Sequence, residues 1–161
     1  MESRTYVLFQ KHNFIGEQKL WFDGKQLCWI DSTGRYNRCW SAVSGRPGYQ
    51  SKQYQSVKDY GPLPEGKWIV KQSEYQTISP RNAALGLIRR GEWVGSVFAW
   101  GRHRIWLHPI GSTKTFGRVN FSIHGGIEPG SAGCIDMTKH IDEFVVRFLE
   151  YRKDMELTVE Y

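Results

Sequence analysis

A histidine and a cysteine in the last third of the chain have the types and the spacing of a catalytic pair. His124 and Cys134 lie ten positions apart in the segment FSIHGGIEPGSAGCIDM, which begins at Phe121. A thiol is a strong nucleophile only as the thiolate, and a neighbouring imidazole can accept its proton. Ten residues can turn back far enough for the two side chains to meet. We therefore predict that Cys134 is a nucleophile and that His124 is its general base.

Four glycines lie between these two residues: Gly125, Gly126, Gly130 and Gly133. Apolar packing does not need so many glycines in so short a segment, whereas close approach of the backbone to a ligand does. We expect Gly125 and Gly126 to contact substrate, and the backbone around Gly133 to approach the oxyanion of a tetrahedral intermediate. The alternative interpretation is structural, with a buried free cysteine and a histidine that ends a strand.

Cationic and aromatic side chains elsewhere could hold a substrate. Arg118, Arg102 and Arg104 could each bind a carboxylate through a bidentate pair of N–H groups. The alternative is that they are surface charges on the edges of strands, which we favour for Arg102 and Arg104. Trp100 could line a binding groove or pack at its rim. The five His and three Cys residues match no common zinc spacing, so we expect neither a metal nor a cofactor.

Length, composition and charge set broader limits. The chain has 161 residues, enough for one domain spanning residues 1–161, and 14% of them are aromatic, which favours a β-rich core. The formal net charge of +6 favours an anionic partner, either a carboxylate-rich cell-wall polymer or nucleic acid. The basic residues could also be a solvated surface. The sequence contains no apolar run long enough to predict a membrane span, and the first residues do not resemble a signal peptide.

Short strands and two helices are expected to position the catalytic pair. Alternation and turn residues predict strands at 6–9, 19–22, 26–30, 37–42, 67–72, 94–99, 104–108, 118–123 and 156–161. Ser79 and Pro80 predict the start of a helix that ends before Gly91, and an apolar stripe predicts a second helix at 139–152. The pattern is typical of a mostly β fold with α, a small sandwich or open barrel with two helices packed outside.

Two of the three cysteines fall on neighbouring predicted strands. A turn centred on Thr33 and Gly34 would place Cys28 directly opposite Cys39. The two thiols could then form a disulfide, or they could remain two reduced apolar side chains.

The segment around the catalytic pair resembles the signature of YkuD-type L,D-transpeptidases, in which a His-Gly pair and a spacer precede Ser-x-Gly-Cys. It is more similar still to a compact branch found among type VI secretion effectors that attack peptidoglycan, because the spacer is short. The sequences AVSG at 42–45 and GPLPEG at 61–66, together with Arg118, extend the resemblance over residues 40–149. It implies the fold of that family.

The resemblance also implies roles for single residues. Cys134 would attack the carbonyl of the L-centre residue of a peptidoglycan stem peptide, with His124 as base. Ser131 matches the Ser of the motif, and the N–H groups of Gly133 and Cys134 would form the oxyanion hole.

Two positions depart from the family pattern. Ala132 stands where a second His is usual, and Asp136 stands where Asn or Arg is usual. An Asp at that position would repel a substrate carboxylate. Asp136 could orient His124 as a third catalytic residue, or it could cap the helix that follows.

The expected function is that of a peptidoglycan-modifying cysteine enzyme, an L,D-transpeptidase or L,D-carboxypeptidase acting on stem peptides. As an effector it would be made in the cytoplasm and act in a rival's periplasm, with a cognate immunity protein and a secretion-system carrier as partners. A cell-wall cysteine amidase is disfavoured because its Cys precedes its His. The alternative outside enzymes is a basic, aromatic module that binds glycan or nucleic acid without catalysis.

Overall fold

The computed structural model describes residues 12–161, and the predicted strand at 6–9 lies outside the described residues. In the described part of the chain, nine strands form one sheet in the order β3-β2-β1-β9-β5-β6-β7-β8-β4. The strands are β1 (Lys19–Phe22), β2 (Gln26–Ile30), β3 (Tyr36–Ser41), β4 (Val43–Ser44), β5 (Gly66–Thr77), β6 (His103–Ile110), β7 (Ser122–His124), β8 (Ile135–Asp136) and β9 (Met155–Val159). The helices are α1 (Pro80–Leu87), α2 (Ser96–Trp100) and α3 (Ile141–Tyr151), with 3-10 turns η1 (Lys52–Tyr54) and η2 (Thr138–His140).

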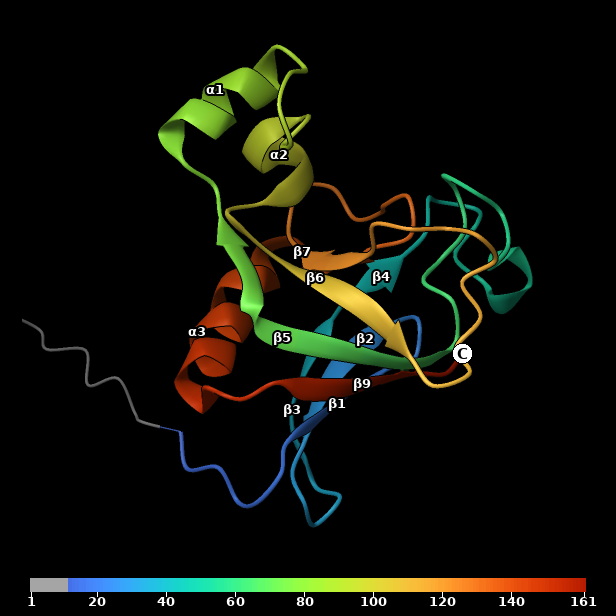
Figure 1. Cartoon of the computed structure of the whole chain (residues 1–161), viewed down its shortest axis with the longest axis vertical. Coiled ribbons are helices and arrows are strands. Elements are labelled where there is room, and N and C mark those ends of the chain that lie inside the picture. The colour runs from blue at the N-terminus through green and yellow to red at the C-terminus, as the bar shows by residue number, and fades with distance from the viewer. Residues whose placement is uncertain (1–11) are drawn as a thin grey trace, which may run out of the picture.

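The sheet curls into a nearly closed barrel. β3 and β4 are its two edge strands, yet only Ala42 separates them in the chain. Because one residue spans less than 4 Å, the two edges must lie next to each other. Large side chains fill the interior, among them the fully buried Trp29, Trp68 and Phe22. The expected mostly β fold is confirmed, and Figure 1 shows the strands together with α3 packed along one side.

The predicted turns and helices agree best with the structure where a few neighbouring residues determine the local conformation. Asp23 Oδ1 accepts hydrogen bonds from the backbone N–H groups of Lys25 and Gln26, both at 2.8 Å, which closes the predicted β1–β2 hairpin. Cys28 lies opposite Cys39 on β3, and the two form a disulfide with their Cα atoms 4.0 Å apart. Of the two alternatives that the sequence left open for these cysteines, the structure has the disulfide.

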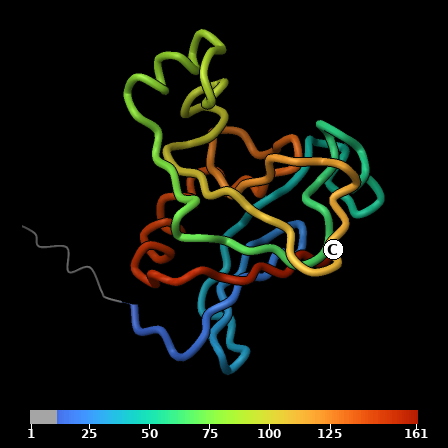
Figure 2. Tube along the Cα trace, in the orientation of Figure 1, coloured from blue at the N-terminus to red at the C-terminus, as the bar shows by residue number. Residues whose placement is uncertain are grey.

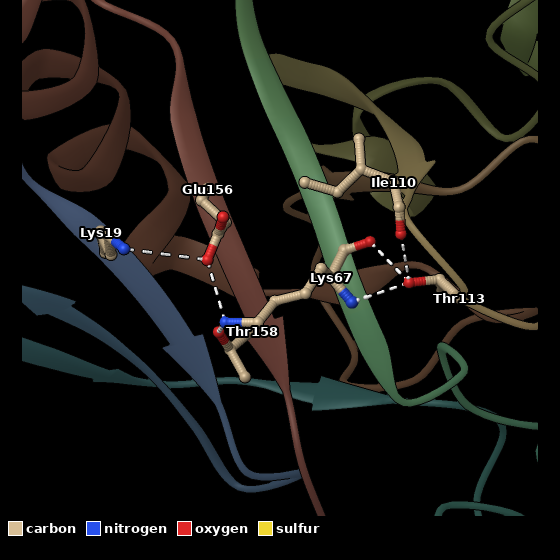
Figure 3. Close-up of polar contacts among 6 residues, drawn as sticks. All are labelled: Lys19, Lys67, Ile110, Thr113, Glu156 and Thr158. Atoms are coloured by element: carbon tan, nitrogen blue, oxygen red, sulfur yellow. Dashed lines mark hydrogen bonds and ion pairs between the residues drawn. The ribbon is translucent and has the colours of Figure 1, made fainter.

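A polar network joins strands on the outer surface of the sheet. Lys67 Nζ on β5 lies 2.9 Å from Glu156 Oε1 and 2.7 Å from Thr158 Oγ1 on β9 (Figure 3). Lys19 on β1 approaches Glu156 from the other side, at 3.9 Å. The Lys67 N–H donates to Thr113 Oγ1, in the turn after β6. These groups are exposed, so each pair adds only a few tenths of a kcal/mol, on the order of 0.2–1.

The segment between β5 and β6 differs from the prediction. Ser79 caps α1 as expected, because its side chain accepts from the Asn82 N–H, but the helix ends at Leu87, well before Gly91. The strand predicted at 94–99 is wrong, because this segment forms α2, so the structure has three α-helices where two were expected. Positive φ angles at Gly95 (91°) and Ser96 (55°) turn the chain into the helix.

Close packing explains this turn. A Cβ on Gly86 would lie 2.1 Å from the Trp93 carbonyl oxygen, so only glycine lets α1 approach the chain that leads into α2. Both helices stand away from the sheet at the top of Figure 1.

Two further predictions agree with the structure to different degrees: the strand at 118–123 and the helix at 139–152. Only Ser122–His124 is a strand, because Asn120 takes a positive φ of 65° and Val119 is 75% exposed. α3 confirms the second predicted helix, and its buried stripe includes Phe144, Val145 and Phe148. Within residues 12–161, no helix has the length and apolar character needed to cross a membrane.

Candidate active site

Three neighbouring strands place the predicted catalytic residues on one face of the sheet. Arg104 on β6 pairs with His124 on β7, and His124 pairs with Asp136 on β8. Paired residues point to the same face, and the alternate residues point to the other. The alternate residues here are Ile105, Ile123 and Ile135, each fully buried in the barrel core. The apolar residues thus fix which side chains turn away from the core.

Cys134 directly precedes β8 and lies beside the second residue of this polar face, Ser122. Ser122 Oγ donates to Cys134 Sγ at 3.3 Å, and Trp106 on β6 pairs with Ser122. Ser122 was not among the predicted site residues, although the alternation in the segment FSIH puts it on the face of His124. The short parallel pairing of β7 with β8 places the strand that follows Cys134 beside the strand that ends at His124.

A cavity of about 620 Å³ opens over this face, and both members of the predicted pair line it. Ser131, Arg118 and Trp100, all predicted site residues, line it too. Its rim carries two exposed cations that the sequence analysis did not single out, Arg46 and Lys58. Figure 2 shows the loop between β4 and β5 beside the loop that precedes β7, which together form this side of the site.

His124 is held as a neutral base. Its ring is 4% exposed, and Nδ1 lies 2.5 Å from the carbonyl oxygen of Gly125. We assign the ring proton to Nδ1, because that atom faces an acceptor, which leaves Nε2 free to accept a proton. Burial lowers the pKa of His124 to about 4; the Gly125 carbonyl opposes this effect, and the charge of Arg104 adds to it. The imidazole is therefore unprotonated at neutral pH.

Cys134 is a buried thiol, 8% exposed, with Sγ 3.7 Å from the Asn120 carbonyl oxygen. Burial raises its pKa above the ordinary value, while the Ser122 hydroxyl opposes that shift. With a thiol of raised pKa and a histidine of lowered pKa, the resting pair is uncharged. An uncharged thiol and imidazole suit general-base catalysis, in which a thiol loses its proton as it attacks.

Asp136 accepts hydrogen bonds from two nearby backbone N–H groups. Its carboxylate accepts from the N–H of Thr138 at 2.8 Å, where η2 begins, and from the N–H of Gly130 at 3.1 Å. The partner of His124 Nδ1 is the Gly125 carbonyl, so the ring is oriented by backbone and not by this carboxylate. The N-cap residue is Met137 for η2 and His140 for α3, and neither element has a side-chain cap, so the structure does not confirm the capping role that the sequence left open for Asp136. Burial raises the pKa of Asp136 to about 6, and the two backbone N–H groups oppose the shift.

Ser131 ties the loop before Cys134 together. Its hydroxyl donates to the Cys134 carbonyl oxygen and accepts from the Gly133 N–H at 3.3 Å. The Gly133 N–H is therefore directed at Ser131 in this structure, not at the cavity, which differs from the oxyanion role inferred from sequence. The Cys134 N–H stays a prediction for that role.

The glycines have packing reasons that the sequence could not show. A Cβ on Gly133 would lie 2.4 Å from Arg118 Nη2, and one on Gly125 would lie 2.5 Å from Ile141. Gly125 and Gly126 are absent from the residues that line the cavity of Cys134. Gly126 lines a second, separate cavity of about 580 Å³. Close packing against η2, α2 and α3 accounts for both glycines, and the substrate contacts expected at Gly125 and Gly126 stay predictions.

Arg118 is 5% exposed and holds loops in place. Nη1 donates to the carbonyl oxygens of Gln55 (2.6 Å) and Pro62 (2.7 Å), and Nη2 donates to those of Gly61 (2.8 Å) and Ala132 (3.3 Å). All four Nη–H groups are used, so a bidentate grip on a substrate carboxylate would require the loops to release them.

Arg104 differs from its prediction as well. It is 1% exposed, so the interpretation as a surface charge on a strand edge is wrong, whereas Arg102 is exposed. Arg104 does not line the cavity either. Among residues 12–161, no group of three or more His, Cys, Asp or Glu side chains is arranged to hold a metal ion.

Comparisons with known proteins address the fold. No protein-family model matches the chain, and no curated protein matches it. The structure is similar to that of Bd1075 from Bdellovibrio bacteriovorus, with a TM-score of 0.54 and 12% sequence identity, over 89% of this chain and 47% of that one. It is also similar to an L,D-transpeptidase from Xylanimonas cellulosilytica, with a TM-score of 0.52 and 12% identity, over 92% of this chain and 63% of that one. This chain has the L,D-transpeptidase fold.

At this identity the likeness concerns the fold alone. The chain spans about half the length of the Bdellovibrio protein and 63% of the Xylanimonas one. Within the L,D-transpeptidase fold, the residues that could do chemistry are those that the cavity brings together: Cys134, His124 and their hydrogen-bond partners.

Proposed function

We propose that this protein is a cysteine acyl transferase or hydrolase that acts on peptidoglycan stem peptides, with Cys134 as nucleophile and His124 as base. One observation carries the proposal. In an L,D-transpeptidase fold, a buried thiol and a neutral imidazole line one cavity, and the imidazole is oriented by the Gly125 carbonyl. The cavity is large enough for a short peptide segment.

The proposed reaction has two steps. His124 Nε2 takes the proton of Cys134 while Sγ attacks the carbonyl carbon of the L-centre residue, which gives a tetrahedral oxyanion. Collapse breaks the peptide bond, and the leaving amine takes the proton from His124, which leaves a thioester on Cys134. His124 then activates water, giving carboxypeptidase activity, or an incoming amine, giving exchange or cross-linking.

Charge at the cavity rim supports a carboxylate-bearing substrate. Arg46 lies with its guanidinium carbon 4.8 Å from the centre of the Tyr60 ring, and its Nε donates to the Asp59 carbonyl oxygen at 2.8 Å. These contacts hold the side chain in place and leave its Nη groups available. Lys58 adds a second exposed cation, and Asp59 is the one acidic residue among those lining the cavity. Stem peptides carry several carboxylates and suit such a rim.

The deciding experiment compares wild type with Cys134→Ala on disaccharide-tetrapeptides, followed by chromatography and mass spectrometry. We expect release or exchange of the terminal D-amino acid, and a loss of about three orders of magnitude or more in the variant. A carbapenem should form a covalent adduct with the wild type alone. Ser112→Ala, an exposed change in the turn after β6, is the matched control. Activity in Cys134→Ala equal to that of the wild type would show that Cys134 is not the nucleophile, and no activity in the wild type would leave the non-catalytic binding module as the better explanation.

A second part of the proposal concerns where the enzyme works. The resemblance to peptidoglycan-attacking effectors suggests an antibacterial protein that is delivered into a rival's periplasm and neutralised at home by an immunity protein. Directing the chain to the periplasm of a host bacterium should slow growth and change the muropeptide profile, and Cys134→Ala should do neither. Unchanged growth and wall composition with stable wild-type protein would refute the toxin role and leave the chemistry to be judged on purified stem peptides.

A further inference from the structure

A buried cation lies beside the proposed general base. Arg104 and His124 are Cα partners on β6 and β7, so their side chains share one face of the sheet. Arg104 is 1% exposed, and it is not among the residues that line the cavity of Cys134. An arginine is almost never this deeply buried unless its charge is paired.

Three tryptophans enclose the guanidinium of Arg104. Its carbon lies 3.9 Å from the ring centre of Trp93, 4.8 Å from that of Trp100 and 4.6 Å from that of Trp106. Tryptophan faces attract a cation through their quadrupole, and guanidinium stacks on them more readily than an ammonium group does. The cage therefore solvates the cation without changing its charge.

Neutral acceptors complete the environment of Arg104. Its Nε donates to Gln76 Oε1 at 2.8 Å and its Nη1 donates to the Glu92 carbonyl oxygen at 2.9 Å. The carboxylate of Glu92 approaches only to 3.9 Å, from a side chain that is 83% exposed, where water screens its charge. Aromatic rings, an amide and a carbonyl leave most of the positive charge uncompensated.

One residue couples this cation to the catalytic pair. Trp100 packs on Arg104, and its ring centre lies 5.0 Å from that of His124. The Trp100 Nε1–H donates to the Val94 carbonyl oxygen at 2.9 Å, which fixes the ring. Its own carbonyl accepts from the N–H of Gly125 at 2.9 Å, the residue whose carbonyl orients His124.

We propose that Arg104, held in its tryptophan cage, is a positioning residue that keeps a fixed positive charge next to His124 and Cys134. This charge disfavours a proton on the resting imidazole and favours negative charge on the sulfur and on the oxyanion derived from it. The catalytic benefit rests on the proposed acyl-transfer function. The effect on His124 and Cys134 themselves requires no substrate.

The charges around His124 come from three sides. Arg104 faces it from β6 and Asp136 faces it from β8, while Cys134 lines the same cavity, which is also lined by Arg118, Lys58, Arg46 and Asp59. Asp136 titrates near pH 6 and contributes to any pH profile of the site. A test must therefore change Arg104 while leaving Asp136 in place, and it must observe His124 directly.

Two variants separate the charge of Arg104 from its packing. Arg104→Met removes the charge. Gln76→Glu keeps Arg104 and its cage and places a carboxylate where the amide oxygen already accepts from Nε, which neutralises the charge in place. Gln53→Glu makes the same chemical change at an exposed position in η1 and serves as the matched control. Arg104→Lys keeps a charge but loses the planar stacking.

The first readout is the NMR titration of the His124 ring, assigned by its absence in His124→Gln. The wild-type midpoint is expected near pH 4. We expect it to rise by about one pH unit or more in Arg104→Met and Gln76→Glu, to rise less in Arg104→Lys and to stay in place in Gln53→Glu.

The second readout is alkylation of Cys134 by iodoacetamide at pH 7, since the other two cysteines are joined in a disulfide. We expect about a tenfold slower reaction in Arg104→Met and Gln76→Glu. Should Arg104→Met fail to fold, Gln76→Glu decides alone, because it leaves the cage intact.

An unchanged His124 midpoint in folded Gln76→Glu overturns the proposal and leaves Arg104 as a packing residue. That result would not touch the proposed enzyme activity, which depends on Cys134→Ala. Conversely, loss of the enzyme proposal would leave the NMR shift standing.

Discussion

Around His124, the two faces of β6, β7 and β8 are both buried but built from opposite chemistry. On the barrel side, Ile105, Ile123 and Ile135 are fully covered by apolar neighbours. On the cleft side, Arg104 and His124 are nearly as covered, yet His124 Nδ1 and the Nε and Nη1 groups of Arg104 each have a carbonyl or amide partner, and the guanidinium lies over aromatic rings. Because successive residues of a strand alternate between faces, one short segment supplies stability on one side and reactivity on the other.

The difference predicts how substitutions on each face affect the protein. An apolar side chain in the core is stabilised by area and shape, so a smaller apolar residue lowers stability in proportion to the space left empty. A buried polar group instead depends on one or two directed contacts, and losing one of them exposes the full desolvation cost of its partner. Changes on the barrel side should therefore appear in unfolding experiments, and changes on the cleft side in kinetics.

The largest expected effect is on the cleft side, with His124→Gln. Without a base to accept the Cys134 proton, turnover on stem peptides should fall by about 10²–10⁴. Thermal or urea unfolding should change far less than this loss of rate implies. His108→Gln, on the same sheet but half exposed, is the control. Turnover within a few-fold of wild type would mean that His124 is not the base.

The next effect tests the barrel side. Ile123→Ala should lower the free energy of unfolding by about 2–5 kcal/mol, and Ile123→Val by about 0.5–1.5 kcal/mol, because Ile123 is fully buried. Turnover per folded molecule should stay near that of wild type. Equilibrium urea denaturation combined with activity measured under native conditions tests both statements. A large loss of turnover in fully folded Ile123→Val would show that the two faces are not separable.

Two titrating groups on the cleft side should change the free energy of unfolding with pH in opposite directions. The pKa of folded His124 is about 4, below the ordinary 6.5, so its contribution is lost as pH falls from 6.5 toward 4. The pKa of folded Asp136 is about 6, above the ordinary 3.8, so its contribution is lost as pH rises from 3.8 toward 6. Between pH 4 and 6 the two slopes largely cancel.

Removing either group should reveal the other. Relative to wild type, His124→Gln should become less stable as pH rises from 4 to 6, and Asp136→Asn should become less stable as pH falls from 6 to 4. Each change should be on the order of 3 kcal/mol or less across that range. Urea midpoints measured at half-unit pH steps suffice. Parallel curves for wild type and both variants would contradict the opposed titrations.

The smallest effect lies at the rim of the cleft. Arg46→Gln and Lys58→Gln should each raise KM for a stem peptide by roughly threefold to tenfold with little change in kcat, and salt should reduce the difference. Arg35→Gln, which removes an exposed charge in the β2–β3 turn, is the control. A substrate with amidated carboxylates should erase the difference between wild type and variants. An equal difference with that substrate would exclude a carboxylate contact.

Local signals in the sequence predicted much of the scaffold. The β1–β2 hairpin at Asp23, the Ser79 cap of α1 and the apolar stripe of α3 each depend on a few neighbouring residues, and each is present in the structure. The helix α2 was mistaken for a strand, because its form depends on the turn at Gly95 and on packing against α1, and neither is visible in local periodicity.

Only part of the candidate site was predicted, because contacts between distant segments are not visible in local sequence patterns. Ser131, Trp100 and the Cys134–His124 pair were found from residue type, spacing and resemblance, and they line one cavity. The cation Arg46 came from a loop far away in the chain and carried no signal of its own. Arg104 and Arg118 look alike in sequence, but one is enclosed by rings and the other by carbonyl oxygens.

The sequence by itself determined the chemistry that is possible: an odd number of cysteines, which leaves at least one thiol free, a histidine ten positions before Cys134, and strands whose isoleucines decide which face looks inward. Tertiary structure decided how that chemistry is tuned. Three tryptophans and a glutamine from separate segments meet at Arg104, and the Gly125 carbonyl meets the His124 ring. The physical reason is that a pKa depends on the groups that surround a side chain in space, whereas spacing along the chain identifies only its neighbours in sequence.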